Sequence, residues 1–223
     1  MTLRILLVAP EQNGIDSIPE LRAITAAHQT TVMNGKVTVR DVYQEARHGS
    51  YHVIHWASHA RDRVLQLSAG ETLSPEDLAQ IGRMAGAQLM FFNSCRSGLL
   101  ASYAVAHGIP FAVYANIDLP DGEAWKMPSA FYHHLAEQAE RAKLATDFAA
   151  AFVHADSRMG LYGFTGSPKT MSDWHSIAGA LEQQSRDLAR LRRDVDRVML
   201  AQRLVLVWLA LSSVLFLLDV VLR

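Results

Sequence analysis

Two stretches decide how this chain is organised: His52-Val53-Ile54-His55-Trp56-Ala57-Ser58-His59-Ala60 and Phe91-Phe92-Asn93-Ser94-Cys95-Arg96-Ser97-Gly98. Each begins as an apolar run of strand length and ends abruptly in small and polar residues. The first ends near a histidine, His59, and the second near Cys95, the only cysteine of the 223 residues. In open α/β sheets, reactive side chains collect at the carboxyl ends of the strands. Two neighbouring parallel strands would bring His59 and Cys95 together, and a nearby imidazole activates a thiol as a nucleophile.

The rest of the amino-terminal region alternates between strand-like and helix-like patterns. Apolar runs predict strands at residues 3–9, 30–33, 51–57, 89–93, 110–115 and 161–165. Helices are expected at residues 18–28, 39–47, 74–86, 99–107, 128–139 and 141–156. Residues 64–73 alternate and turn at Ala69-Gly70, which predicts a hairpin. This order favours an α/β fold with a mostly parallel sheet sandwiched by helices.

The histidines and the cysteine also have simpler interpretations. A buried cysteine usually acts as a small apolar core residue, and a histidine at a strand end is often a satisfied structural group. A zinc site made by His55, His59 and Cys95 is a second alternative, but the His-x-x-x-His spacing binds zinc from a helix and here lies on a strand. We therefore expect no metal and no cofactor, and we expect His52 and His55 to pack in or flank the strand.

A strand ending in Ser-His-small, followed by a strand ending in Ser-Cys-x-Ser-Gly, resembles the caspase-like cysteine peptidases of clan CD. Within that group the chain is most similar to the bacterial CHAT domains. Residues 64–74 resemble the hairpin that these domains place between the two strands, and residues 106–110 and 130–135 resemble a later strand and helix. The resemblance covers residues 3–167. It implies a caspase-like fold and a cysteine endopeptidase acting on a protein substrate, with Cys95 as nucleophile and His59 as general base.

The resemblance also implies an oxyanion site and a substrate pocket. The oxyanion would face the backbone N–H of Cys95 and one near Ala60. Relatives usually carry glycine after the histidine, so Ala60 would be strained by about 1 kcal/mol if its φ were positive. The residue two before the cysteine helps to wall the first specificity pocket, and the neutral Asn93 there does not demand a basic substrate residue. Glu11 and Asp16 are candidates for added charge, although a solvated loop is the interpretation that we favour.

The carboxyl-terminal part differs in pattern from this peptidase-like domain, which we assign to residues 1–168. Residues 169–203 read as a helical stalk with an a/d seam, interrupted at Gln184; the seam residues are Ile177, Leu181, Leu188, Leu191, Val195 and Val198. The stalk either forms a homo-oligomer or packs on its own domain. Residues 204–222 are apolar except for Ser212, Ser213 and Asp219. At about 1.5 Å per residue, a helix of this length approaches the bilayer's ~30 Å hydrocarbon core, which predicts a transmembrane helix.

Charge sets the predicted orientation and narrows the function. Six arginines between residues 186 and 203 precede the apolar segment and Arg223 follows it, which predicts a single-pass membrane protein with a cytoplasmic amino-terminal domain. The chain has 21 basic and 22 acidic residues and no basic patch, which argues against a nucleic-acid partner. The predicted function is a membrane-tethered cysteine endopeptidase. The resemblance implies that the protein is a triggered effector in bacterial defence or cell death. The alternative is a catalytically silent CHAT-like scaffold or signalling module.

Overall fold

The computed structural model describes residues 3–11, 17–61, 63–119, 124–138, 148, 151–152, 154–155 and 161–166. The chain divides into two compact units, Met1–Ala178 and Gly179–Arg223, and all of the described residues belong to the first. Asp16, the predicted stalk at 169–203 and the predicted transmembrane helix at 204–222 lie outside the described residues. Within the described residues, no helix combines the length and apolar character needed to cross a bilayer.

A six-stranded sheet forms the centre of the first unit. Its strands lie in the order β2-β1-β3-β7-β8-β9. All neighbouring pairs are parallel except β8 and β9, which are antiparallel. The prediction of a mostly parallel sheet is therefore confirmed. The strands are β1 (Arg4–Pro10), β2 (Gln29–Gly35), β3 (Val53–Ala57), β7 (Leu89–Asn93), β8 (Phe111–Ala115) and β9 (Tyr162–Gly166).

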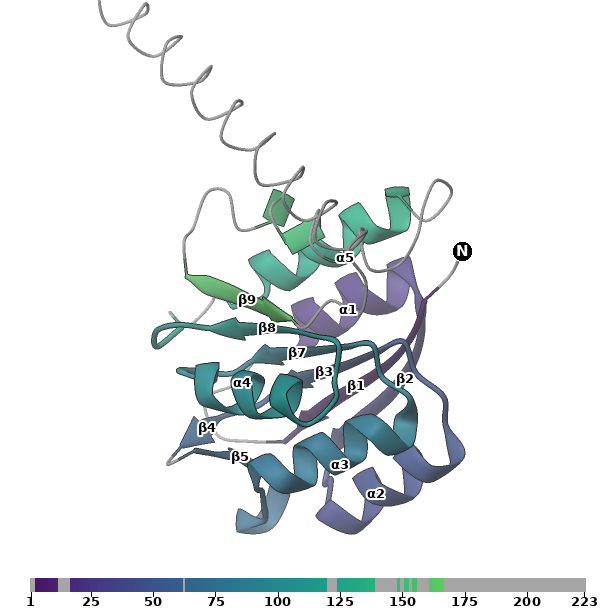
Figure 1. Ribbon diagram of the computed structural model, residues 1–223. Helices are drawn as coiled ribbons and strands as arrows, with labels where there is room; N and C mark the ends of the chain where they lie inside the picture. Colours follow the sequence, from purple (N-terminus) through teal and green to yellow (C-terminus); the bar gives the residue numbers. More distant parts are fainter. Residues whose placement is uncertain are drawn as a thin grey trace, which may run out of the picture. The chain divides into compact units, whose positions relative to one another are not determined.

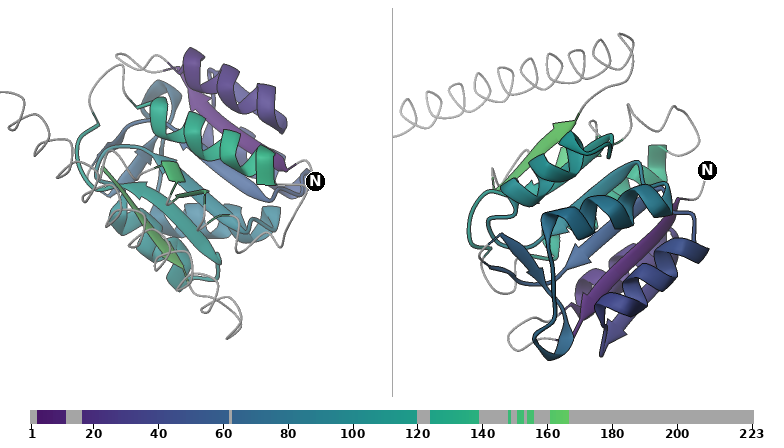
Figure 2. Two further views of the ribbon diagram at one scale, coloured as in Figure 1. Left: turned by 90° about the horizontal axis from the view of Figure 1, so that it is seen from above. Right: turned by 60° about the horizontal axis from the view of Figure 1, so that its bottom comes forward.

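Helices cover both faces of this sheet, as predicted. One face carries α1 (Ile18–Ala27) and α5 (Lys126–Gln138), which lie side by side (Figures 1 and 2). The other face carries α2 (Val39–His48), α3 (Pro75–Ala85) and α4 (Gly98–Ala106) (Figure 1). Every residue of β3 and β7 is buried, which is why both strands read as nearly continuous apolar runs.

The sheet separates two hydrophobic cores. Ile54 and Trp56 of β3 face the core under α2, α3 and α4, together with Met90 and Phe92 of β7. Val53 of β3 faces the core under α1 and α5, together with Leu89 and Phe91 of β7. His55 alternates with these residues and is fully buried on the α1 and α5 side, stacked on Phe91 at 4.7 Å between ring centroids. The expectation that His55 packs into its strand is confirmed.

A second, small sheet lies beside the carboxyl ends of the main strands (Figure 1). It consists of β4 (Ala60–Arg61), β5 (Val64–Gln66) and β6 (Thr72–Leu73), paired antiparallel in that order. A short 3-10 helix at Ser68–Gly70 joins β5 to β6, so the predicted hairpin is confirmed. Strand β4 was not predicted, because two residues are too short to show a strand pattern.

Helix α3 has residues at both of its ends that mark its boundaries in the sequence. The Ser74 hydroxyl accepts the N–H of Asp77, and the Asp77 carboxylate accepts the N–H of Ser74, which satisfies two backbone donors at the helix start. Pro75 occupies the first turn, where its missing N–H has no effect. Gly86 ends the helix with φ of 67°, a left-handed conformation that glycine adopts without strain.

Candidate active site at the strand ends

The register of β3 and β7 shows that the two predicted reactive residues leave the sheet at the same edge. The two strands are parallel neighbours, and the last residue pair of their ladder is Ala57 and Asn93. His59 follows Ala57 by two residues, and Cys95 follows Asn93 by the same two residues. Both residues therefore leave the sheet from adjacent strands at the same edge, which is the edge where α/β proteins place their reactive groups.

Two positive features surround the half-buried sulfur of Cys95. The N–H of Leu119 donates a hydrogen bond to Sγ over 3.3 Å. Helix α4 begins at Gly98, so its amino terminus, with its exposed N–H groups and positive dipole end, lies just after the cysteine in the chain. Both features are partial positive charges close to the cysteine.

The turn that carries Cys95 is tied firmly to the end of β8. The N–H of Arg96 bonds to the carbonyl of Ile117 over 3.2 Å, and the N–H of Ser97 bonds to the carbonyl of Ala115 over 3.1 Å. The buried Ser97 hydroxyl bridges the carbonyl of Phe92 and the N–H of Ala115. The Arg96 guanidinium also lies 2.6 Å from the Asp118 carboxylate. These bonds fix the position of Cys95 relative to the sheet.

Cys95 and His59 line two different pockets. The pocket at Cys95 has a volume of about 440 Å³, and Ala60, the residue after His59, also lines it. The pocket at His59 has a volume of about 400 Å³ and includes Glu11. The residues that sequence reasoning assigned to the oxyanion site, Cys95 and Ala60, thus share one pocket. The imidazole of His59 and the charge of Glu11 belong to the other.

Ala60 does not carry the backbone strain that a positive φ would cause. Ala60 belongs to β4 and pairs with Leu65, and the non-glycine residues with positive φ in the described chain are Arg63, Ala69 and Arg96. The condition under which Ala60 would be strained, a positive φ, is therefore not met. The extended conformation accepts alanine without a steric penalty.

Asn93 is buried at the end of β7, and both polar groups of its side-chain amide form hydrogen bonds. Its amide nitrogen donates to the Glu20 carboxylate over 2.7 Å and to the carbonyl of Ala124 over 3.1 Å. Its amide oxygen accepts the hydroxyl of Tyr162 over 2.6 Å. Asn93, Glu20 and Tyr162 are all buried. The amide therefore joins α1, β7 and β9 rather than pointing into open solvent.

The same buried network also includes His55, which contacts Glu20 and Tyr132. Nε2 of His55 lies 2.6 Å from Oε1 of Glu20, at an angle unsuited to a hydrogen bond, so the contact is electrostatic. Nδ1 of His55 lies 3.0 Å from the hydroxyl of Tyr132. Burial, with the nearby Glu20 carboxylate, raises the pKa of Tyr132 well above its ordinary value. His55 is thus occupied within the core and does not turn toward Cys95.

These contacts bear on the zinc alternative. His55 is enclosed between Glu20, Tyr132 and Phe91. Among the residues that the structure describes, no group of three His, Cys, Asp or Glu side chains could hold a metal ion. The residues present do not make a metal centre of His55, His59 and Cys95.

Comparison with known proteins tests the fold. No family model and no curated protein matches the chain. Among solved structures, the Arg-specific cysteine proteinase gingipain R matches with a TM-score of 0.51 and 12% sequence identity. The match covers 74% of this chain and 46% of the gingipain chain. The fold is caspase-like. The chain spans less than half of the gingipain chain, and an identity this low concerns the fold alone.

In this caspase-like fold, the candidate pocket residues Asn93 and Glu11 lie in different surroundings. Asn93 is buried beside Glu20, whereas Glu11 is exposed at the end of β1 and lines the pocket of His59. The acidic partner of Asn93 was missed because Glu20 occupies the first turn of α1, where acidic residues are common in any helix. Arg61 and Arg63 were also missed, since nothing in a short hairpin marks an arginine as lining a pocket.

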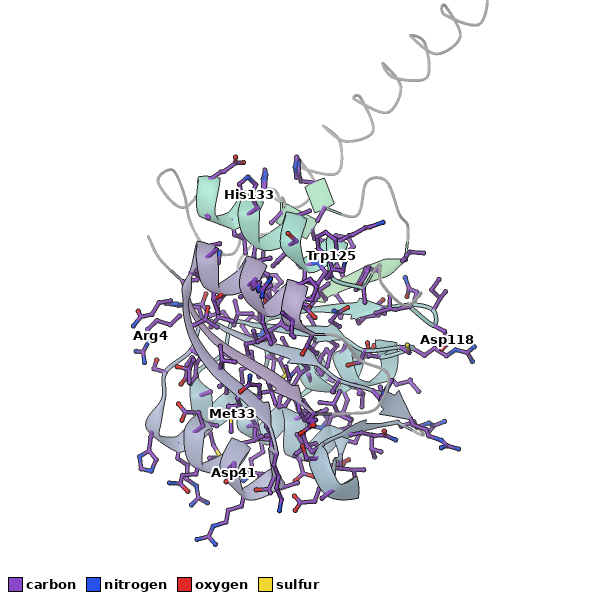
Figure 3. The ribbon with its side chains drawn as sticks, turned by 180° about the vertical axis from the view of Figure 1, so that it is seen from behind. Arg4, Met33, Asp41, Asp118, Trp125 and His133 are labelled. Carbon is purple, nitrogen blue, oxygen red and sulfur yellow. The ribbon has the colours of Figure 1, made fainter. Side chains whose placement is uncertain are left out.

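Exposed apolar side chains mark the same edge of the caspase-like sheet. Among the described residues, the large apolar side chains that remain exposed are Ile18, Leu99, Ile117 and Trp125. Each follows a strand or begins a helix after one. Asp118 is next to Ile117, and Arg4 is the first residue of β1. The two side chains lie on opposite sides of the first unit (Figure 3). Leu99 also lines the pocket at Cys95.

Proposed function

We propose that this protein is a cysteine endopeptidase in which Cys95 is the nucleophile and His59 is the general base and acid. The observation that carries the proposal is the register of β3 and β7, which puts both residues two positions beyond the same ladder pair. The caspase-like fold, the N–H donor on the sulfur and the exposed apolar side chains nearby add support. The substrate class is protein.

The chemistry follows from these positions. His59 takes the thiol proton, and Sγ of Cys95 attacks the peptide carbonyl carbon to form a tetrahedral oxyanion. The N–H groups of Cys95 and Ala60, which share one pocket, would face this oxygen. The protonated His59 then gives its proton to the leaving amine, and a thioester remains on Cys95. Water, activated by the imidazole, hydrolyses the thioester and restores the thiol.

A cysteine-directed probe tests this proposal directly. A peptide acyloxymethyl ketone should label the wild-type chain at Cys95, and labelling should fall at least tenfold in His59→Ala because the imidazole no longer activates the thiol. His52→Ala is the matched control, since His52 bonds through Nδ1 to the N–H of Arg4 at the opposite strand end. His59→Ala labelling at the wild-type rate would reject the dyad. Loss of proteolysis in Cys95→Ala is the companion result.

A catalytically silent module is the second candidate function. The observation that favours it is the separation of the two side chains, because Cys95 and His59 line different pockets. Hydrogen bonds between catalytic groups often tighten only when substrate binds, so this separation is compatible with both functions. In a silent module, the probe would label Cys95 at the same slow rate with and without the His59 imidazole.

We further propose that the domain is tethered to a membrane and is activated by a trigger, in the manner of effectors in bacterial defence or cell death. The tether would be residues 204–222, with the arginine-rich side in the cytoplasm. The seam at residues 172–203 would allow weak pairing that becomes effective when the helices are concentrated at a membrane.

A further inference from the structure

Strand β2 is an edge strand without the features that normally protect an edge. It lies at one end of the six-stranded sheet (Figure 1) and pairs with β1 along all seven of its residues, without a bulge. Its sequence, Gln-Thr-Thr-Val-Met-Asn-Gly, contains no charged residue and no proline. Exposed edges usually carry charges, prolines or bulges, or are very short, because unpaired backbone groups otherwise bind another strand. The edge at β2 is therefore open to pairing.

The hydrogen bonds to β1 show which backbone groups of β2 point outward. The N–H of Gln29 donates to the carbonyl of Leu3, and the N–H of Glu11 donates to the carbonyl of Gly35. Backbone groups alternate in direction along a strand, so every second residue from Gln29 to Gly35 faces β1. The residues between them turn their N–H and carbonyl groups away from β1: Thr30, Val32 and Asn34. The hydrogen bonds among the described residues include none to these outward groups.

These three residues fit a second copy of the same strand. In an antiparallel pair centred on Val32, Val32 lies opposite Val32 of the copy, and Thr30 lies opposite Asn34 of the copy. Opposite residues of this kind exchange both of their N–H···O bonds. All outward N–H and carbonyl groups of the two strands are then paired. No like charges meet across the contact, because the strand carries none.

The side chains on both faces of β2 fit the same arrangement. Val32 packs against the core under α1 and α5, and Met33 packs against the core under α2, α3 and α4. Both side chains remain partly exposed at the edge. The two-fold axis of such a pair stands normal to the sheet, so each face of one copy continues as the same face of the other. Each core would meet its own equivalent, and Val32 and Met33 would be covered.

We infer that β2 is a dimerisation edge, at which two copies of this chain join antiparallel through Thr30, Val32 and Asn34 and form one continuous sheet. A second copy is the partner that the strand fits, since it satisfies every outward group and matches both apolar faces. A charged peptide would find no opposite charge on β2. The contact is separate from the seam proposed at residues 172–203, and it does not depend on the peptidase function.

Disulfide trapping tests the contact, because Cys95→Ala leaves the chain without any cysteine. In that background Val32→Cys puts the two opposed Cα atoms about 5.5 Å apart, within the range that a disulfide can bridge. The full-length protein in detergent micelles is oxidised with copper phenanthroline and analysed by non-reducing gel electrophoresis. A covalent dimer is expected. If Val32→Cys is folded by circular dichroism and stays monomeric, the inference is overturned.

Two further single-cysteine variants test the register and leave Val32 intact. Thr30→Cys alone, or Asn34→Cys alone, puts the thiols of the two copies about 14 Å apart along the strands, beyond the reach of a disulfide. A mixture of the two variants places one thiol opposite the other, so its dimer should form about tenfold faster than the dimer of either variant alone. Equal rates in the mixture and in the single variants, as random collision or contact through the stalk would give, overturn the inference.

Val32→Pro removes the outward N–H at the centre of the contact. The fold of one copy should survive, because an edge strand tolerates proline where the N–H faces away from its neighbour. Added to both members of the mixed pair, this change should slow dimer formation about tenfold. Ser102→Ala, an exposed change on α4, should leave the rate unchanged. Trapping that continues at the original rate in the folded proline variant contradicts pairing through β2.

Discussion

Nε2 of His55 lies 2.6 Å from the carboxylate of Glu20, and both side chains are almost completely buried. The contact joins α1 to the centre of β3, two residues before that strand ends near the candidate active site. Glu20 also accepts the amide of Asn93 from β7. One carboxylate therefore connects both strands that carry the proposed dyad, and its loss should affect the whole strand-end region.

Replacement of Glu20 should destabilise the fold. Glu20→Ala removes the acceptor of the buried Asn93 amide and the carboxylate that lies against the buried His55 ring, and we expect a loss of about 3 kcal/mol in the free energy of unfolding. Glu20→Gln keeps an amide oxygen at the site and should recover part of the loss. Urea denaturation followed by tryptophan fluorescence measures the change, because Trp56 is fully buried.

A second histidine–carboxylate pair on the surface provides the control. His133 and Glu137 lie 3.3 Å apart on α5, with side chains that are 74% and 60% exposed. Solvent screens such a pair, so Glu137→Ala should leave the urea midpoint unchanged. Equal effects of Glu20→Ala and Glu137→Ala would mean that the buried contact contributes nothing.

His28 should make the protein less stable in mild acid. Burial lowers the pKa of His28 below its ordinary value, and the hydrogen bond to the carbonyl of Tyr132 offsets only part of this effect. Its Nδ1 is buried, and no hydrogen-bond partner for it is found among the described residues, so protonation would place a charge there without an acceptor. The unfolded chain takes up this proton near pH 6.5 and the folded chain only at lower pH. Stability is therefore full above about pH 6.5 and falls as the pH drops toward the folded pKa.

His28→Gln isolates this contribution. Glutamine can still donate to the Tyr132 carbonyl but takes up no proton in this range. Urea midpoints at pH 7.5 and pH 5 should therefore differ less in His28→Gln than in the wild type. An equal drop in both proteins would assign the acid sensitivity to other groups.

The parts of the fold that sequence predicted are those with a local signal. The strands at Val53–Ala57 and Leu89–Asn93 were located because both are buried on two faces and so contain no polar residue apart from His55 and the terminal Asn93. Helix α3 was located because Ser74, Pro75 and Gly86 mark its ends. The antiparallel direction of β9 was not predicted, since the pattern of a five-residue strand carries no direction.

The candidate site was predicted less completely, because most of it is assembled from distant parts of the chain. Cys95 and His59 could be named since each follows an apolar run. The network of Glu20, His55, Asn93, Tyr132 and Tyr162 joins five separate elements, and no spacing along the sequence reveals such contacts. The N–H of Leu119 on the sulfur is a backbone group, so residue type gives no signal for it at all.

Membrane attachment should depend on residues 204–222. The full-length protein is expected to stay in the membrane pellet after carbonate extraction, whereas a chain ending at Gln202 should be recovered in the supernatant. Val214→Arg/Leu215→Arg is a length-matched variant, in which two charges near the centre of the segment should abolish insertion. Extraction of the full-length protein into the supernatant would reject an integral anchor.

Asn93 should be required as an amide because of the carboxylate that it faces. In Asn93→Asp an oxygen replaces the nitrogen that lies 2.7 Å from Glu20, so two buried carboxylates would meet at hydrogen-bond distance. We expect a loss of about 2 kcal/mol in unfolding free energy at pH 7.5. The loss should shrink toward pH 5, because the folded-state pKa of the introduced carboxyl is raised and its protonated form can donate to Glu20. This requirement gives a physical reason for asparagine at this position.

A double-mutant cycle tests whether the Glu20 carboxylate is the cause. In Glu20→Gln/Asn93→Asp the amide and the carboxylate exchange places, so the glutamine nitrogen can donate to the introduced carboxylate and restore the bond. The double variant should then be more stable than the sum of the two single losses predicts. The expected difference is about 1 kcal/mol, a magnitude typical of directly bonded pairs. Additive losses, measured from urea midpoints at pH 7.5, would show that Asn93 and Glu20 are not coupled and that the amide is held by Ala124 and Tyr162 alone.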